Sequence, residues 1–405
     1  MSNNTSQNRL LPIGIDPGHD TCGVAFLHPD QDIVLEEFLL SNRCLPEAEK
    51  LLAKAARLAQ EFSTQPVFVL EATNVFWRPL ASWLRAQGAL VHVVSSKQTH
   101  ANRSTGMRKT KTDLIDAALI ARLYKQHKSS PPYLPQEPYM SLRELSRLNA
   151  FLVDIKSRLQ NRIHTVLYQI NPIWTEVFAH PFTKGSLALM QREWVHPRKL
   201  ADADPADIGE VLKTVTYGKQ GPVFAQNLQA ATAKLFTIQE GEEGFSFALK
   251  CLAEVVQALD GVLDQLDTRL ARLLTDVSAD VLQTIPGMSS KTTASFVGEL
   301  GDPRRFASPD KAVAWFGMDP SLEQSGFDPG TGRKWSKAGS KYGRRTMYLV
   351  ALSFMKAVPQ ARRKFQQLVR AGRSKKEALC ILAADLVKVG LAMLKSQQKF
   401  DPKKV

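Results

Sequence analysis

Four carboxylates stand where a folded chain could bring them together. Asp113 and Asp116 are three residues apart in a stretch of helical character, so one helix face would carry both. Asp16 and Glu71 each end a short apolar run further upstream. Carboxylates at close range repel unless a cation or a shared proton relieves them, and hard divalent ions prefer oxygen ligands. Each acid singly is more often a cap or surface group, but the four together predict a site for two hard divalent ions that activates a nucleophile at phosphorus.

The elements around these acids predict an α/β domain over residues 1–130. Continuous apolar runs such as residues 66–70 are typical of strands buried on both faces of a sheet. We expect strands at residues 11–16, 22–27, 33–38, 66–70 and 90–94, and helices at 45–62, at 77–87 and from Asp113. This order is that of a ribonuclease-H-like sheet. Sites in open α/β sheets form at strand ends, which is where Asp16 and Glu71 stand.

The positive charge of the chain is concentrated in two places. The net charge is +14, and residues 326–405 hold 19 Lys/Arg against 4 Asp/Glu. A second excess lies between residues 97 and 128. A solvated tail is the plainer interpretation, but the basic residues alternate with apolar helical ones, which favours a folded surface for nucleic acid. The candidate phosphate contacts are Lys109, Lys111, Arg333, Lys334, Lys337, Arg344 and Arg345.

Two long helices are predicted in the middle of the chain, within a connecting region over residues 131–278. Apolar residues recur every three or four positions up to Ile170, and again as a leucine heptad seam from Leu249 to Leu273. The two helices either pack on each other within one chain or join subunits, and we expect a homo-oligomer, a dimer or a tetramer. Residues 172–244, between the two helices, are predicted to form an irregular insert.

A basic, mostly helical domain is predicted over residues 279–405. The stretch at 282–288 with its Pro-Gly turn, followed by a Ser/Thr/Ala-rich helix, resembles a helix-hairpin-helix element that can present backbone N–H groups to phosphate. Downstream, Ser325 precedes a glycine and has basic residues near it in the sequence. It is therefore a candidate nucleophile toward a phosphodiester. Ser-Gly is chiefly a turn dipeptide, and Ser321, Ser336 and Ser340 compete for the role.

Composition excludes several other classes of protein. The four cysteines show no metal-ligand or paired spacing, which argues against a zinc site and a disulfide framework. Residues 1–9 lack the apolar core of a signal peptide, and the apolar late stretch is broken by charges. We expect a cytosolic protein.

Several segments, taken in order, resemble one family. These are IGIDPGHDTCGVAFL, VLEATNVFWRPLASWL, KTKTDLIDAALIARL, LQTIPGMSSKTTASFVGELGDPRRFASPDKAVAWFGMDPSLEQSG and GRKWSKAGSKYGRR. They are similar to the DEDD-plus-serine transposases of bridge-RNA-guided insertion sequences, which are related to pilin-gene invertases. The resemblance covers both ends of the chain and leaves residues 172–244 without a matching motif.

This resemblance implies a mechanism. A RuvC-like N-terminal domain would bind Mg²⁺ through Asp16, Glu71, Asp113 and Asp116. Ser325 of a C-terminal transposase domain would attack DNA and form a transient phosphoserine link, with the acids of one subunit serving the serine of another. A noncoding guide RNA would select donor and target DNA by base pairing.

Two alternatives, an endonuclease and a non-catalytic scaffold, stay open at this point, together with one variant of the main interpretation, a guide-free invertase. A RuvC-like junction endonuclease would use water in place of Ser325 and form no covalent adduct. A guide-free DNA invertase would need no RNA. A non-catalytic nucleic-acid-binding scaffold would not respond to Mg²⁺, and the intact set of four acids argues against it.

Overall fold

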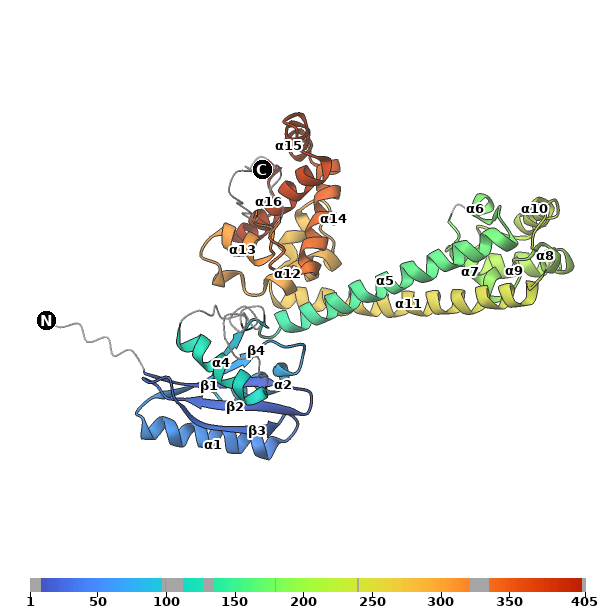
Figure 1. The fold of residues 1–405 in the computed structure, drawn as a ribbon. Coiled ribbons are helices and arrows are strands. Elements are labelled where there is room, and N and C mark those ends of the chain that lie inside the picture. Colours follow the sequence, from blue (N-terminus) through green and yellow to red (C-terminus); the bar gives the residue numbers. More distant parts are fainter. Residues whose placement is uncertain are drawn as a thin grey trace. The chain divides into compact units, whose positions relative to one another are not determined.

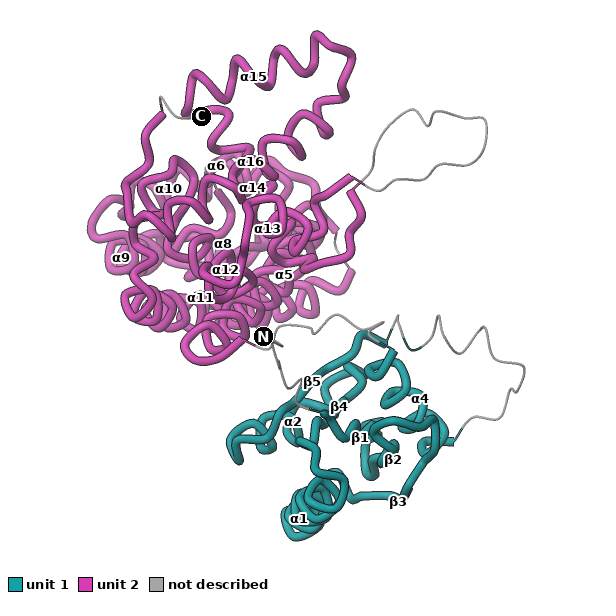
Figure 2. Tube along the Cα trace, turned by 90° about the vertical axis from the view of Figure 1, so that its left-hand side faces the viewer, with its two compact units in different colours: residues 1–134 teal, residues 135–405 magenta. Residues whose placement is uncertain are grey.

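The chain folds into two compact units, residues 1–134 and residues 135–405 (Figure 2). The computed structural model describes residues 9–96, 99, 112–126, 135–178, 180–238, 240–320 and 335–402. Among these residues, no helix is both long enough and apolar enough to cross a membrane.

The first unit is built on a five-stranded mixed sheet with the strand order β3-β2-β1-β4-β5. Its elements are β1 (Leu10–Pro17), β2 (Thr21–Leu27), β3 (Val34–Ser41), α1 (Leu45–Glu61), β4 (Gln65–Glu71), α2 (Trp77–Ala86), β5 (Leu90–Val94) and α4 (Asp113–Lys125). The first three strands are antiparallel, whereas β4 runs parallel to both β1 and β5. The predicted order of strands and helices is confirmed, and so is the ribonuclease-H-like α/β fold.

Alternation along the strands explains why helices cover both faces of this sheet. Phe68 and Leu70 of β4 pack with α1 and α2, whereas Val67 and Val69 point to the other face and pack with Ile120 of α4. Successive side chains of a strand face opposite ways, so a run that is apolar at every position must be buried on both sides. In Figure 1, α1 and α4 lie on opposite faces of the sheet.

Two long helices, α5 (Tyr139–Ile170) and α11 (Glu242–Asp276), form the axis of the second unit. They lie side by side along most of their length (Figure 1), and Lys156 of α5 pairs with Asp260 of α11. Leu249, Val256 and Leu270 of the predicted seam are buried. The interpretation that the helices pack within one chain is therefore confirmed, while the oligomer stays a prediction.

The expectation that residues 172–244 are irregular was wrong. They form five helices, α6 (Trp174–Val177), α7 (Lys184–Gln191), α8 (Pro197–Asp202), α9 (Pro205–Val215) and α10 (Pro222–Thr232). These helices share an apolar core with the C-terminal half of α5 and the N-terminal half of α11. These helices are too short to show a long apolar periodicity. Three of them begin at a proline, which is favourable in a first helical turn but in a sequence usually indicates the end of a helix.

A second apolar core lies at the other end of the long helices. It holds η1 (Asp280–Thr284), α12 (Ser290–Leu300), η2 (Pro303–Arg305), α13 (Pro309–Trp315), α14 (Lys341–Ala357), α15 (Pro359–Arg370) and α16 (Lys375–Ser396). Leu142 of α5 and Leu270 of α11 belong to the same core. The predicted division of this unit at residue 278 stays a prediction.

The Pro-Gly turn before α12 is packed inside this core. A Cβ atom on Gly287 would lie 2.7 Å from the Cβ of Ser353 in α14, so the turn needs a glycine for close packing. The preceding helix is the short 3-10 helix η1, and Ser289 caps α12 by accepting a hydrogen bond from the backbone N–H of Thr292. The predicted phosphate contact of this turn stays a prediction.

Candidate functional site

Asp16 and Glu71 lie at the same edge of the sheet because their strands are parallel neighbours. Ile15 of β1 is opposite Leu70 of β4, so the residue that follows each one extends toward the same edge. Asp16 is also paired with Gly23 across the antiparallel β1–β2 ladder. The structure therefore brings together two of the four predicted carboxylates through backbone register alone.

Helix α4 adds Asp113 to this edge. A Cβ atom on Gly23 would lie 2.1 Å from the Asp113 carbonyl oxygen and 3.0 Å from its Cβ, so the first turn of α4 rests directly on the strand position that pairs with Asp16. Thr112 fixes where the helix begins, because its side chain accepts a hydrogen bond from the backbone N–H of Ile115. The glycine in β2 is what lets the helix approach this closely.

The pKa of the Cys22 thiol is affected by the carboxylates of this edge. Burial raises its pKa to about 12, and the negative charges of Asp16 and Asp113 contribute to the rise. A thiolate is disfavoured both by the loss of water and by nearby carboxylates. Cys22 is therefore a protonated core residue that borders the acidic edge, as expected for a reduced, buried thiol.

The two acids of α4 differ in exposure. Asp113 is exposed at the first turn, whereas Asp116 is only 3% exposed and lies next to Ala117, whose carbonyl oxygen would be 1.9 Å from a Cβ on Gly14. Glu71 is also buried, and the hydroxyl of Thr73 donates a 2.9 Å hydrogen bond to its Oε1 atom. Two of the four acids, Glu71 and Asp116, are therefore buried, whereas Asp16 and Asp113 reach solvent.

This donor set suits a hard divalent ion, although the described residues do not form a finished coordination group. Four carboxylates from β1, β4 and α4 offer the oxygen ligands that Mg²⁺ prefers. Within the described ranges, no three His, Cys, Asp or Glu side chains gather closely enough to hold a metal ion. The assignment of Asp16, Glu71, Asp113 and Asp116 as metal ligands stays a prediction.

The predicted phosphate contacts divide into two groups. Four of them, Lys109, Lys111, Arg333 and Lys334, lie outside the described residues, as does the predicted nucleophile Ser325. The other three, Lys337, Arg344 and Arg345, come together with Lys376 at a hollow of about 330 Å³ in the second unit, which Trp335 and Tyr348 also line. Sequence reasoning missed Lys376 and both aromatic residues, because only the fold places them beside α14.

Arg344 and Arg345 have partners within the chain. Arg344 donates hydrogen bonds to the carbonyl oxygens of Phe316 (3.0 Å) and Gly339 (2.8 Å), and burial lowers its pKa. Arg345 binds both carboxylate oxygens of Asp154 at 2.8 and 2.9 Å, and this contact raises its pKa. Arg344 is thus a structural donor, whereas the Arg345 pair is half exposed and can yield to phosphate at modest cost.

The ends of the segment that carries Ser325 are held together by backbone pairing. Pro320 and Trp335 form an antiparallel bridge, and the backbone N–H of Ser336 donates to the carbonyl oxygen of Asp319 at 2.9 Å. The Ser336 hydroxyl donates to the Asp319 carboxylate. Ser336, one of the competing serines, therefore has a structural partner.

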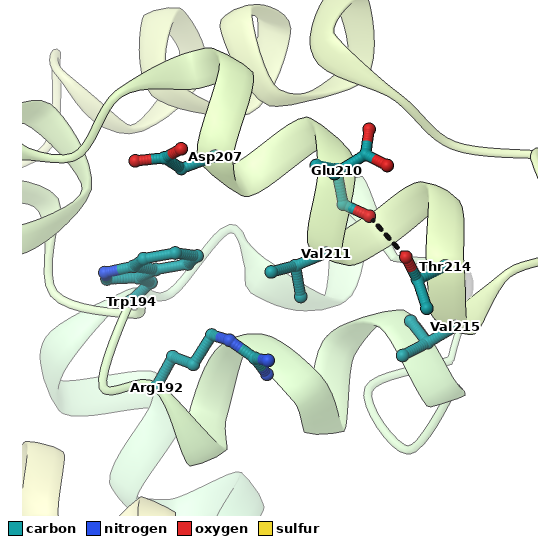
Figure 3. Close-up of a pocket in the computed structure, with 7 residues that line it drawn as sticks. All are labelled: Arg192, Trp194, Asp207, Glu210, Val211, Thr214 and Val215. Atoms are coloured by element: carbon teal, nitrogen blue, oxygen red, sulfur yellow. Dashed lines mark hydrogen bonds between the residues drawn. The ribbon is translucent and has the colours of Figure 1, made fainter.

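A further hollow, of about 420 Å³, lies among the helices of residues 172–244 (Figure 3). Asp207 and Glu210 of α9 line it together with Trp194 and Arg192. Carboxylates repel phosphate, so this hollow is a poor candidate for nucleic acid.

Comparisons with known proteins match both the N-terminal and the C-terminal part of the chain. A family model for transposases with a DEDD domain matches residues 13–172, and the model described as Transposase IS116/IS110/IS902 family matches residues 279–366. The 44.8 kDa protein of insertion element IS116 from Streptomyces clavuligerus is 27% identical over 74% of this chain and 76% of its own length. The 43.6 kDa protein of insertion element IS110 from Streptomyces coelicolor is 24% identical over 87% and 88%. The pilin gene-inverting protein of Moraxella bovis is 23% identical over 85% and 84%.

A ribonuclease-H-like DEDD unit followed by a largely helical, basic region defines a phosphoryl-transfer enzyme of the transposase class. The chain belongs to the IS110/IS116 family of transposases and is related to pilin gene-inverting proteins. DNA is therefore its partner, and recombination of DNA its activity.

Proposed function

We propose that this transposase exchanges DNA strands through a covalent Ser325–DNA intermediate in a magnesium-dependent reaction. The observation that supports it best is the sheet edge, where the register of β1 and β4 aligns Asp16 with Glu71 and where α4 rests on Gly23. Mg²⁺ held there by Asp16, Glu71, Asp113 and Asp116 would supply charge to polarise a phosphodiester and stabilise the oxygen that leaves it.

The residues of the chain have separate roles in this proposal. The buried pair, Glu71 and Asp116, anchors the site, and the more exposed Asp16 and Asp113 face the DNA. The hydroxyl oxygen of Ser325 would form a bond to phosphorus while the bond from phosphorus to the 3′ oxygen breaks, and the proton that serine loses would pass to the departing 3′ oxygen, which leaves as a hydroxyl group. Lys337 and Arg345 hold the backbone of the strand near α14 by charge.

The proposal extends to RNA and to a second subunit. A noncoding guide RNA would choose donor and target DNA by base pairing, while the protein holds the backbone of both nucleic acids. The acids of one subunit would act on DNA held at the serine of another. Both ideas come from the family resemblance.

A denaturing gel tests the chemistry. We expect wild-type protein, incubated with Mg²⁺, RNA transcribed from the ends of the element and matching DNA, to give a covalent protein–DNA band. Ser325→Ala and Asp16→Asn should each abolish the band. Asp32→Asn is the matched control, because Asp32 is 72% exposed and pairs with Arg122, away from the acidic edge.

The result also decides among the alternatives. Cleaved DNA without a band, unchanged in Ser325→Ala, would replace the proposal with an endonuclease that uses water. A band that forms equally well without RNA would indicate a guide-free invertase. Full cleavage by Asp16→Asn would remove the metal assignment.

A further inference from the structure

A second basic hollow lies beside the N-terminus of α14, and the proposed function has not used it. Its volume is about 430 Å³, which is enough for one nucleotide. We call it the Tyr342 pocket and define it by Arg143, Arg147, Trp315, Ser340, Lys341 and Tyr342. These residues come from α5, α13 and α14, so the pocket lies entirely within the second unit.

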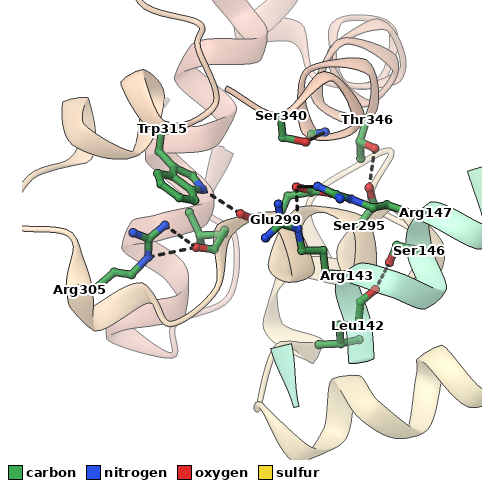
Figure 4. A network of polar contacts seen from close by, with 12 residues as sticks. Leu142, Arg143, Ser146, Arg147, Ser295, Glu299, Arg305, Trp315, Ser340 and Thr346 are labelled. Atoms are coloured by element: carbon green, nitrogen blue, oxygen red, sulfur yellow. Dashed lines mark hydrogen bonds and ion pairs between the residues drawn. The ribbon is translucent and has the colours of Figure 1, made fainter. Parts of the chain in front are cut away.

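The arginines of this pocket are held in place by Glu299, a carboxylate whose side chain is 1% exposed. Arg147 binds it with two hydrogen bonds, Nε to Oε1 at 2.6 Å and Nη2 to Oε2 at 3.1 Å, and the Nε of Arg143 lies 3.5 Å from Oε2 (Figure 4). Gly298 allows this contact, because a Cβ there would lie 2.6 Å from the Arg143 backbone nitrogen. Helix α12 therefore carries its acid directly against α5.

The pocket keeps a positive charge despite its buried acid. One carboxylate faces two guanidinium groups, and Lys341 adds an exposed ammonium group. Burial lowers the pKa of Arg147, but the contact with Glu299 raises it by more than burial lowers it. The net shift is upward, so the guanidinium stays charged at any physiological pH. The first turn of α14 adds the positive end of a helix of 17 residues, capped by Ser340, whose hydroxyl accepts from the N–H of Gly343 at 3.1 Å.

Two aromatic rings stand among these charges. The guanidinium of Arg147 lies 5.1 Å from the centre of the Tyr342 ring. The indole N–H of Trp315 donates to the carbonyl oxygen of Glu299 at 2.8 Å, and Arg305 stacks 4.0 Å from its ring (Figure 4). The hydrogen bond fixes the orientation of the Trp315 indole before any ligand binds, and Tyr342 has two cationic neighbours, because the Nζ atom of Lys341 also lies 5.1 Å from the centre of its ring.

Cations beside aromatic rings match the two halves of a nucleotide. A phosphate is attracted by ammonium groups and by a helix N-terminus, and an unstacked base gains energy on an aromatic ring whatever its identity. A base within a duplex is already stacked on its neighbours and is not free to stack on these rings. We propose that the Tyr342 pocket binds one nucleotide of a single strand, with its phosphate at Lys341 and its base against Trp315 and Tyr342.

This inference extends the proposed function, because the strand would be one that takes part in exchange. The described segment from Trp335 to Lys341 leads into α14, so a nucleotide held here would fix the path of the strand at the N-terminus of this helix. Deoxyribose and ribose strands share the chemistry described, and a direct comparison distinguishes them.

Binding of labelled oligothymidylate and oligouridylate to the full chain tests the pocket. We expect Tyr342→Ala to weaken binding of the preferred strand about fivefold or more, since stacking of one base contributes at least that factor. Tyr342→Phe keeps the ring and should bind within about twofold of wild type. Lys341→Gln should weaken binding and lower the slope of log affinity against log salt by about one.

Lys356→Gln is the matched control, since it removes the same charge from an exposed position at the other end of α14. Thermal unfolding of each variant distinguishes loss of nucleotide binding from loss of the fold. Lys341 is exposed, so Lys341→Gln should leave the apolar core unchanged. Photocrosslinking with an iodouracil strand should label Tyr342 or Trp315.

Equal affinity of wild type and Tyr342→Ala for single strands would overturn the inference, as would crosslinks confined to other residues. Duplex DNA that binds the pocket with the same dependence on Tyr342 would overturn it as well. These measurements need no strand cleavage. A missing Ser325–DNA band with intact pocket binding would therefore count against the proposed function alone.

Discussion

Burial of a carboxylate means different things at different places in this molecule. Glu71 is buried at the sheet edge that Asp16 also borders, and Asp116 is buried in α4, whereas Glu299 is buried between two arginines. A carboxylate among carboxylates is a group that a metal ion would stabilise, and a carboxylate among guanidinium groups is already neutralised. The sign of the neighbouring charges therefore separates the candidate metal site from a structural ion pair.

Glu299→Gln should destabilise the second unit. The amide keeps the size of the side chain but leaves two partly buried guanidinium groups without their counter-charge, which costs about 3 kcal/mol. We expect a clear fall in the urea midpoint of the full chain. Asp310→Asn, which removes the partner of Lys388 at an 81% exposed side chain, should change it little. Equal midpoints for both variants would show that Glu299 contributes no more than a surface pair.

Single residues were predicted well where the backbone dictates their place and poorly where side-chain partners decide. Asp16 and Glu71 stand at the C-terminal ends of parallel strands, so strand direction alone puts them at one edge. Arg344 was predicted to contact phosphate because of its charge, yet its side chain donates hydrogen bonds to two backbone carbonyl groups. Arg143 and Arg147 stand in a helix far upstream in the sequence, and nothing in their local pattern indicates that they meet Tyr342.

Elements with a strong period were predicted closely. The run of residues 66–70 became β4 (Gln65–Glu71), and residues 77–87 became α2 (Trp77–Ala86). The five short helices between residues 172 and 244 were missed because each spans three turns or fewer and gains its stability from a shared core. Trp174, fully buried with its indole N–H donating to Ser186, belongs to that core, but its sequence neighbours show no repeat.

The contact between α4 and the sheet depends on Gly14 of β1. A methyl group there would lie 1.9 Å from the Ala117 carbonyl oxygen and 2.8 Å from the Ala121 backbone nitrogen, so Gly14→Ala must push the helix away. We expect a loss of about 2 kcal/mol, faster hydrogen exchange in α4 and loss of strand cleavage, because Asp113 and Asp116 move with the helix.

Gly261→Ala is the matched control for this prediction. Gly261 lies inside α11, and open space surrounds the position of its Cβ. The substitution should stabilise the protein by about 0.5–1 kcal/mol, because alanine loses less backbone freedom in a helix than glycine does. Unchanged hydrogen exchange in α4 of Gly14→Ala would show that the helix does not rest on this strand position.

At the scale of the whole molecule, the two units carry different parts of the proposed chemistry. The acids stand in residues 1–134, and the basic hollows beside α14 stand in residues 135–405. Each unit has an apolar core of its own, and the second has one core at each end of its long helices. The proposed strand exchange would therefore use acids and a serine that belong to different units of the chain.

Separate units allow the acids of one subunit to act on the serine of another, and a mixture of two inactive proteins tests this. Asp16→Asn keeps Ser325, and Ser325→Ala keeps the acids. If the site is shared, randomly formed dimers should recover about a quarter of the wild-type sites, since half of them are mixed and each has one intact composite site. The DNA should be attached only to the Asp16→Asn chain, which a size tag identifies on the gel. A mixture of Ser325→Ala with the double variant should give no adduct, because no chain in it carries the serine. No adduct from two single variants that have exchanged subunits would mean that each chain completes its own site, and the long helices would then connect cores within one chain without a role in sharing catalysis.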